Sequence, residues 1–434
     1  MGFQLPSSLS PARRPSSFSE QDYLIGLRGL LVIESFLWCF LQVFVPTAVA
    51  GSANSHGPLY QVILRKTLSV LFWNEALIYS FFIFLSARLV CLPFLKESTP
   101  ATVMSSVFRR CIRLWFPTAV AFSMATLIFS QQGVAYIDNF KMHTGNVTIQ
   151  TPRKIPSFLN FFNSLFEIFW ITKNTASQAA NTAFPSQTLW MVNILFEQGY
   201  TVYMTMVIIP YTRNSWRVKA LICFILTAWW VQSWAWYSIS GLLLADVLTN
   251  MGFREKSRRG VRITRNIQFP LWILYATLMF AGLIMQYLWT AWRPQYVDYE
   301  LKGHTGLYNA GSLNAGLDPN QPQARDDNYL IILGFFLLLE QYEWIQMLFK
   351  NPLFLYLGRR SFSYFLVQSL IIYTAGIKLF MHLRVTKNWP LEPSAFICFI
   401  VCLPTVALSS EVFYRAVDYS AIAISRFALD WIRK

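Results

Sequence analysis

Eight ionisable side chains lie inside long apolar stretches of this sequence, where charge is costly. A charge at the centre of a membrane helix costs about 2.5–3.5 kcal/mol on insertion scales, so such residues are candidates for substrate or proton chemistry. So many together indicate a hydrated internal cavity. The alternative is that they pair and hold helices together, Arg88 with Glu75 or Glu34 for example. The eight are Glu34, Glu75, Arg88, Glu197, Asp246, Glu340, Glu343 and Glu411.

A second group able to do chemistry is a basic run that opens another apolar stretch. Arg109 and Arg113 are four residues apart and share a helix face, with Arg110 beside them. Three guanidiniums there are able to hold a cytosolic phosphate or diphosphate by bidentate hydrogen bonds. Arg28 is expected near the same side. The alternative is a topology signal with anionic lipid contacts.

The composition indicates that membrane helices position these groups. Of the 434 residues, 55% are hydrophobic and only 13% are charged, whereas soluble domains carry roughly 25% charged residues. A water-soluble enzyme is therefore excluded. The net charge of +15 is what basic residues flanking membrane spans produce, so we expect no nucleic-acid partner.

Apolar stretches of about 20 residues cross a bilayer, and their number predicts the fold class. We expect an all-α, polytopic integral membrane protein with about ten transmembrane helices. The fifth and sixth stretches are short and nearly joined. The ten stretches are residues 24–50, 68–95, 111–130, 188–210, 216–232, 234–250, 269–292, 328–349, 361–382 and 393–414.

Basic residues set the expected orientation. The side that holds both termini carries 23 of the 36 Lys and Arg residues, so both termini are predicted to be cytosolic. The sequon Asn146-Val147-Thr148 falls on the predicted lumenal side and marks Asn146 as a glycosylation candidate. The endoplasmic reticulum or Golgi is the default location for such a chain.

This topology predicts three parts of the chain. A disordered cytosolic N-terminus (1–22) precedes a membrane domain (23–418), which carries lumenal loops at 131–187 and 293–327, and a cytosolic C-terminal tail (419–434) follows. The six cysteines lie in or at the ends of spans, and the four histidines lack metal-ligand spacing. We therefore expect neither a disulfide framework nor a bound metal or cofactor.

Seven short motifs resemble those of the acyltransferase-3 family of integral-membrane O-acyltransferases, particularly its fungal members. Each motif alone is weak, but all seven follow the family's order across the ten predicted spans. They are residues 23–31 (YLIGLRGLL), 81–88 (FFIFLSAR), 109–117 (RRCIRLWFP), 189–197 (LWMVNILFE), 240–246 (SGLLLAD), 357–368 (LGRRSFSYFLVQ) and 413–418 (FYRAVD).

The resemblance implies transfer of an acyl group, often acetyl, from an acyl-coenzyme A to a hydroxyl of a small hydrophobic metabolite, a lipid or a sugar. Acyl-coenzyme A, such an acceptor and membrane lipids are therefore the expected partners. The acceptor would enter a membrane cavity at Glu75, Trp190, Glu197 and Gln368. The cytosolic donor would bind at Arg28, Ser86, Arg88, Arg109, Arg110 and Arg113.

The catalytic base is where this chain departs from the family. The family carries a His eleven residues after the arginine of span 1, where this chain has Cys39, and Gln368 replaces a later His. A hydroxyl acceptor needs a base because its own pKa is far above 7. Glu34 as base and Cys39 as an acyl-carrying thiolate are the two candidates. Glu34 and Cys39 are five residues apart, which is a rotation of about 500°, or roughly 140° beyond a full turn of a helix. They therefore do not share a helix face.

Two other functions stay open at this point. One is a catalytically silent relative that binds or transports acyl or lipid substrates. The other is different chemistry in the same cavity, such as carbocation chemistry on a polyprenyl substrate, which the aromatic-rich spans would suit. Consumption of labelled acetyl-coenzyme A separates acyl transfer from both.

Overall fold

The computed structural model describes residues 21–172, 174–264, 267–296 and 321–433. These residues are mostly helical, with one antiparallel hairpin between β1 and β2, which confirms the predicted all-α class. The expected N-terminal segment 1–22 lies outside the described residues except for its last two. Most of the expected loop 293–327 lies outside them as well.

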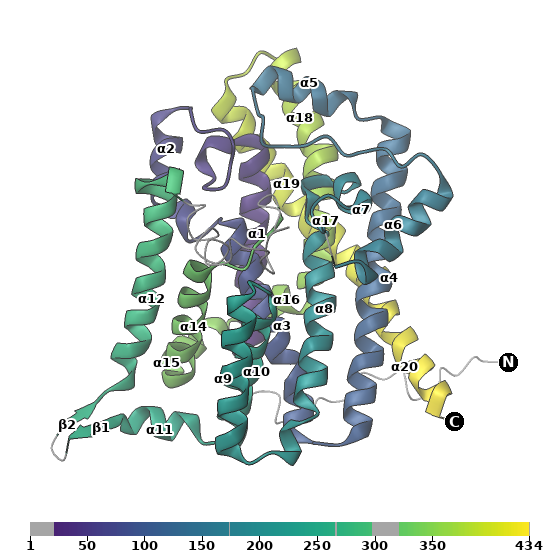
Figure 1. Ribbon diagram of the computed structural model, residues 1–434. Coiled ribbons are helices and arrows are strands. Elements are labelled where there is room, and N and C mark those ends of the chain that lie inside the picture. Colours follow the sequence, from purple (N-terminus) through teal and green to yellow (C-terminus); the bar gives the residue numbers. More distant parts are fainter. Residues whose placement is uncertain (1–20, 173, 265–266, 297–320, 434) are drawn as a thin grey trace, which may run out of the picture.

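Figure 1 shows long helices running in roughly one direction, with shorter helices at both ends. The helices and strands are α1 (Asp22–Phe44), α2 (Leu59–Lys66), α3 (Glu75–Lys96), α4 (Pro100–Gln132), α5 (Ala135–Thr144), α6 (Phe158–Trp170), α7 (Ala179–Ala183), α8 (Trp190–Met206), α9 (Asn214–Trp230), α10 (Ala235–Asn250), α11 (Phe253–Arg259), β1 (Val261–Thr264), β2 (Ile267–Phe269), α12 (Leu271–Tyr287), α14 (Asp326–Gln341), α15 (Glu343–Phe349), α16 (Pro352–Arg359), α17 (Ser361–Ile371), α18 (Ile377–Met381), α19 (Leu391–Phe413) and α20 (Tyr419–Arg433).

Every predicted apolar stretch coincides with helix, but the structure does not confirm ten spans. Seven helical segments among the described residues are long and apolar enough to cross a membrane. An eighth is possible if α14 and α15, which bend by 106° at their junction, are one broken span. Helices α9 and α10 have only 17 and 16 residues. At 1.5 Å per residue they are about 25 Å long, short of the ~30 Å hydrocarbon core.

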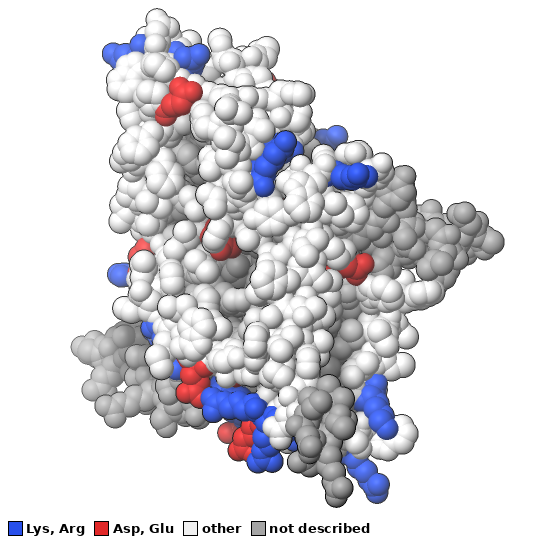
Figure 2. Space-filling model, turned by 90° about the vertical axis from the view of Figure 1, so that its left-hand side faces the viewer, with Lys and Arg blue, Asp and Glu red and all other residues white. Residues whose placement is uncertain are grey.

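The two ends of the molecule are distinct. The start of α1, the end of α20, α11 and the β hairpin lie toward one end, called here the terminal face, and α2 and α5 lie at the opposite face (Figure 1). On the side drawn in Figure 2, Lys, Arg, Asp and Glu gather mainly toward these two ends, with a largely uncharged surface between them. This distribution is compatible with a membrane protein.

Close contact between α1 and α16 explains two glycines of the motif-bearing segments. A Cβ on Gly29 would lie 2.0 Å from the carbonyl oxygen of Phe354, and one on Gly358 would lie 1.8 Å from that of Ile25. Only glycine permits this approach, as is common where membrane helices pack on small residues. The crossing fixes Arg28, the neighbour of Gly29, against the start of α17.

The segment 131–187, expected as a lumenal loop, contains three helices. The ring of Phe161 in α6 stacks on Phe122 of α4 at 5.0 Å, and Phe166 lies 6.1 Å from Trp115. Trp115 is 17 residues before the end of α4, so α6 reaches about 25 Å along that helix. Helix α6 therefore packs along about half of the length of α4.

The C-terminal helices form one rod. A π-helical stretch, Tyr414–Asp418, joins α19 to α20 without a break. The rod from Leu391 to Ile432 has 42 residues, about 63 Å at 1.5 Å per residue, so it is longer than a bilayer's hydrocarbon core. The expected boundary between membrane domain and C-terminal tail, residue 418, falls at the π-helical stretch.

Candidate functional site

A cavity of about 540 Å³ lies near the opposite face, between α1, α3, the start of α8, the α9–α10 turn and the α12–α14 pair. Helices α9 and α10 do not reach the top of α12 (Figure 1). Trp234 of the turn and Trp190 of α8 line the cavity, with ring centroids 6.4 Å apart. Trp190, which was expected at a substrate cavity, thus lines a cavity.

Glu75, the first residue of α3, also lines this cavity. Three other charged residues do so, and the structure accounts for each. Arg325 forms a two-point ion pair with Asp327, at 2.9 and 3.2 Å. Arg65 donates hydrogen bonds to the carbonyls of Ala50, Ser52 and Asn54 at 2.8–3.1 Å. Glu75 has neither a hydrogen bond nor an ion pair within the described chain.

Arg65 shapes the mouth of the cavity. Its three hydrogen bonds hold the loop between α1 and α2 in place. Burial lowers the pKa of the Arg65 guanidinium, because it has lost solvent. A guanidinium titrates so far above neutrality that it stays charged. The loop between α1 and α2 is therefore held at the cavity by a positively charged side chain.

Cys39 lies just behind the cavity wall. Its thiol is fully buried and sits 3.2 Å from the hydroxyl of Ser186, which does line the cavity. Ser186 and Gln187 have φ angles of +60° and +49°. Such left-handed backbone at non-glycine residues costs of order 1–3 kcal/mol each and clusters at functional sites. This strained pair therefore belongs to the candidate site.

Two of the expected cavity residues, Glu197 and Gln368, and the candidate base Glu34 lie elsewhere. Gln368 is buried and donates to the hydroxyl of Ser35 at 2.7 Å. Glu197 is half-buried on α8, and Glu34 is half-buried on α1. None of these three is among the described residues that line the cavity. Cys39 is thus near the cavity and Glu34 is not.

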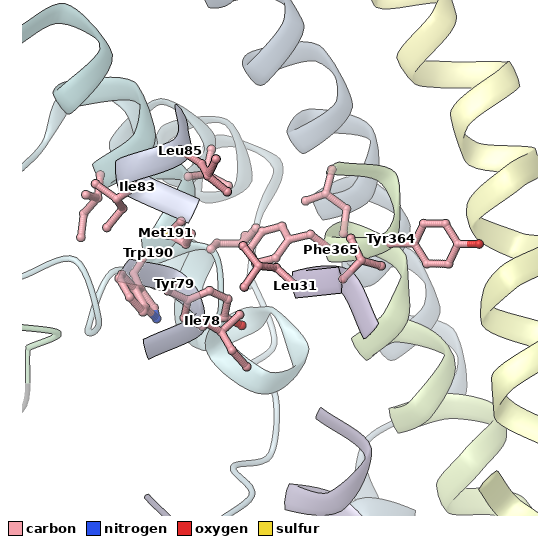
Figure 3. Packing of buried hydrophobic residues seen from close by; sticks show 14 of the residues in the cluster. Leu31, Ile78, Tyr79, Ile83, Leu85, Trp190, Met191, Tyr364 and Phe365 are labelled. Atoms are coloured by element: carbon pink, nitrogen blue, oxygen red, sulfur yellow. The ribbon is translucent and has the colours of Figure 1, made fainter. Parts of the chain in front are cut away.

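A layer of buried aromatic and aliphatic side chains packs against Trp190, on the side of the cavity toward the terminal face. Figure 3 shows Tyr79 and Trp190 side by side, with Leu31 and Phe365 in the same buried group. The Tyr79 ring meets Trp190 edge-on at 5.3 Å and Phe365 at 6.0 Å. All four residues are buried. They lie between the cavity and a basic cluster nearer the terminal face.

That basic cluster consists of Arg28, Arg110 and Arg113, called here the arginine cluster. The three guanidiniums lie within electrostatic range of one another, although they come from α1 and α4. Arg28 donates to the hydroxyl of Ser361 at 2.5 Å. Asp418 is the nearby counter-charge. Arg113 is exposed and has no hydrogen bond or ion pair to the described residues.

Arg110, a member of the arginine cluster, also links three helices. It donates to the Ser86 hydroxyl at 2.9 Å and to the Leu195 carbonyl at 2.7 Å, which joins α3, α4 and α8. Ser86 therefore contacts the cluster directly, through Arg110. The neighbouring Arg109 donates to the carbonyl of Ser105, one turn back on its own helix. Five of the six expected donor-site residues thus gather in one region.

Arg88 is the sixth, and it lies apart from the others. Its guanidinium forms a buried ion pair with Glu340 and donates to the Tyr23 hydroxyl at 3.1 Å. Tyr23 in turn donates to Glu340 at 2.5 Å. Pairing was the structural alternative for Arg88, but the partner is Glu340 of α14 rather than Glu75 or Glu34. This contact leaves Arg88 buried and engaged.

Other carboxylates in the apolar stretches are paired as well. Asp246 accepts from Arg217 at 2.8 Å, and Glu343 from Arg258 at 3.0 Å. Glu411 is held by Arg360 and, at 2.7 Å, by Arg415. Of the eight intramembrane candidates, Glu34, Glu75 and Glu197 are the ones whose side chains have no hydrogen bond or ion pair in the described structure. Only Glu75 among them faces the cavity.

Asn146, the glycosylation candidate, has a structural position. It is 1% exposed, and its amide nitrogen donates to the carbonyls of Gln42 and Val43 at 3.0 and 2.9 Å. Its amide oxygen accepts from the backbone N–H of Thr148 at 2.9 Å. A glycan on this nitrogen would break the contacts with the end of α1.

The sequence did not point to several residues of the cavity. Nothing in the sequence marks Ser186 and Gln187 as site residues, because Ser and Gln do not by themselves predict a left-handed backbone. The cavity wall also holds nine Asn and Gln side chains, including Gln286 on α12 and Asn328 on α14. A search for charges in apolar stretches passes over neutral amides.

The chain is 22% identical to the O-acetyltransferase PaAT-1 of Phomopsis amygdali over 465 aligned positions, which cover 99% of this chain and 88% of the relative. No family model matches the chain, and no solved structure matches it. The relative supports acetyl or acyl transfer in general for this chain. At this identity it does not establish the acyltransferase-3 family.

Proposed function

We propose that this protein is a membrane-bound O-acyltransferase that moves an acyl group, acetyl in the first instance, from acyl-coenzyme A to a hydroxyl. The observation that carries the proposal is Glu75, an unpaired carboxylate on the wall of a cavity within a helical, membrane-compatible fold. The full-length similarity to a protein named as an O-acetyltransferase supports the reaction class.

The arginine cluster is the proposed donor site. Clustered guanidiniums repel one another unless an anion lies between them, and they bind phosphate oxygens bidentately. Arg113, exposed and without a partner in the described chain, is the member best placed to meet a solvent-borne phosphate. With both termini in the cytosol, this cluster faces the compartment that contains acyl-coenzyme A. The endoplasmic reticulum or Golgi remains the proposed location.

Glu75 is the proposed general base. It would take the proton of the acceptor hydroxyl as the oxygen attacks the thioester carbonyl carbon. The carbon–sulfur bond then breaks, the new ester forms, and the coenzyme leaves as a thiolate that recovers the proton. No cofactor or metal enters this sequence. Cys39 would support the wall through Ser186, since its thiol lies behind the surface of the cavity.

The test uses purified protein in lipid nanodiscs with acetyl-coenzyme A labelled in the acetyl group. We expect coenzyme A thiol to be released faster when an acceptor alcohol is added, with the label in an ester of that alcohol. Binding of acetyl-coenzyme A without consumption, across acceptors of every class, would instead favour the silent binding or transport relative.

A further inference from the structure

A groove of about 620 Å³ runs along α6 and shares no lining residue with the cavity at Glu75. Its walls are α6, the segment 153–156, and Ile171 and Ala179 from the connection to α7. The volume is within the range of about 300–1,000 Å³ that small-molecule sites have. Helix α6 packs beside α4, a candidate membrane span, at the side of the molecule away from α12 (Figure 1). A ligand can therefore reach the groove from the bilayer.

One wall of the groove is a row of exposed aromatic rings, called here the aromatic ladder. Phe162, Phe166 and Trp170 are four residues apart, so they lie on one face of α6. They are 47%, 36% and 58% exposed, and the centroids of neighbouring rings are 4.8 and 5.6 Å apart. The ladder is about 12 Å long at 1.5 Å per residue. A continuous exposed apolar surface of this kind marks an interaction site, and its shape suits an acyl chain.

A basic pair, Arg153 and Lys154, forms another part of the wall. Both residues are exposed, and neither side chain has a hydrogen bond or ion pair within the described chain. The backbone N–H of Arg153 donates to the carbonyl of Thr182 at 3.0 Å. Pro152 and Pro156 flank the pair and restrict its backbone. An anchored segment thus presents two cations, and a guanidinium beside an ammonium suits a phosphate.

The groove also contains one carboxyl group, that of Glu167. It is half-buried on α6 and forms no ion pair with Arg153, Lys154 or any other described residue. Opposite charges that line one groove without contacting each other favour a ligand that carries both signs. Its phosphate would meet the basic pair and its ammonium would meet Glu167, because complementary charges guide recognition.

We propose that this groove binds a membrane phospholipid with an ethanolamine head group. The phosphate lies at Arg153 and Lys154, the ammonium at Glu167, and one acyl chain along the aromatic ladder. A choline head has no N–H to donate to the carboxylate, and a glycerol head has no cation. The basic pair falls in the segment predicted to be lumenal, where basic residues do not set the orientation, so a topology signal does not explain it.

The site does not depend on the proposed acyl transfer, and the experiment needs no turnover. Native mass spectrometry of the delipidated full-length protein in detergent follows titrations with dioleoyl-phosphatidylethanolamine, -phosphatidylcholine and -phosphatidylglycerol. We expect the ethanolamine lipid to bind most tightly. Arg153→Gln/Lys154→Gln should weaken it roughly ten- to thirty-fold, since each basic side chain near a membrane surface contributes about five-fold. The matched control is Arg213→Gln/Lys219→Gln, two exposed basic residues outside the groove, which should bind as the wild type does.

Two further variants separate the head group from the chain. Glu167→Gln removes the partner of the ammonium, so binding of phosphatidylethanolamine should fall about two- to five-fold, the scale of a partly exposed ion pair. Binding of phosphatidylglycerol should not fall, and the preference between the two lipids should disappear. Phe162→Ser interrupts the aromatic ladder, so it should weaken all three lipids alike and keep the order of preference.

The result that would overturn the proposal is specific. Equal affinity of the wild type for the three lipids, or unchanged phosphatidylethanolamine binding in Arg153→Gln/Lys154→Gln, would refute a built phospholipid site. Tighter binding of phosphatidylglycerol than of phosphatidylethanolamine by the wild type would refute the role of Glu167, and with it the ethanolamine head group.

Discussion

Helix α3 carries two ionisable side chains that the fold treats in opposite ways. Arg88 is buried against Glu340 and Tyr23, from two other helices. Glu75, 13 residues earlier, faces a cavity and has no hydrogen bond or ion pair in the described structure. Both looked alike in the sequence, as costly charges in one apolar stretch. Their surroundings separate a charge that joins helices from a charge that is available to a substrate.

The largest effect, on stability, is expected from breaking the Arg88–Glu340 ion pair. Glu340→Leu leaves Arg88 as a buried charge without its carboxylate, which should destabilise the protein by about 3–5 kcal/mol. The measurement is thermal unfolding in nanodiscs. In Arg88→Met/Glu340→Leu both charges are gone, and stability should recover to near that of the wild type. A double variant as unstable as Glu340→Leu would contradict this role of the pair.

Substitution of the unpaired Glu75 should change activity rather than stability. Glu75→Gln keeps the size of the side chain and removes its basicity, so turnover should fall by about 10²–10⁴. Melting temperature and donor binding should stay unchanged, because no contact in the described structure is lost. The matched control is Glu197→Gln, another unpaired carboxylate, which lies away from the cavity.

The same assay decides between the candidate bases. Loss of turnover in Glu34→Gln with normal activity in Glu75→Gln would place the base on α1 and refute our assignment. An inactive Cys39→Ser, with a thioester found on the wild-type cysteine by mass spectrometry, would show covalent acyl transfer instead.

A smaller effect is expected at the arginine cluster. Arg113→Lys keeps the charge but loses the planar fork that grips phosphate. One charge-assisted hydrogen bond is worth about 1.5–3 kcal/mol, so affinity for acetyl-coenzyme A should fall roughly ten- to hundred-fold. Arg258→Lys, at an exposed ion pair near the terminal face, is the control and should bind normally. Equal donor binding in Arg113→Lys, Arg113→Ala and wild type would leave the cluster as a topology signal.

The helices were predictable because apolar length is a local signal, but their number was not. The 106° bend between α14 and α15 and the early end of α9 depend on how neighbouring helices pack. The arginine cluster was partly predictable, since Arg110 and Arg113 lie on one helix. The partner of Arg88 was not, because Glu340 is 252 residues away in the sequence. Neutral residues of the cavity, such as Asn328, gave no signal at all.

The smallest effect concerns Asn146, where a motif of three residues suggested a glycan and the fold shows an amide in use. Its nitrogen donates to two carbonyls at the end of α1, which no helical N–H satisfies. Asn146→Ala should therefore cost about 1–3 kcal/mol of stability, measured by thermal unfolding. Treatment of the wild type with an endoglycosidase should leave its mobility unchanged, since the acceptor nitrogen is buried.

The control for that prediction is Thr148→Ala, which destroys the sequon and keeps the Asn146 amide. Its hydroxyl contacts Asn54 and Ser52 near the surface, so we expect a smaller loss of stability than in Asn146→Ala. A mobility shift on deglycosylation that both variants abolish would show that the nitrogen is modified. The contacts between Asn146 and α1 would then be absent from the mature protein. The absence of a mobility shift, together with a loss of stability mainly in Asn146→Ala, would show that Asn146 resembles Arg88. Both would then be polar side chains whose hydrogen bonds stabilise the fold.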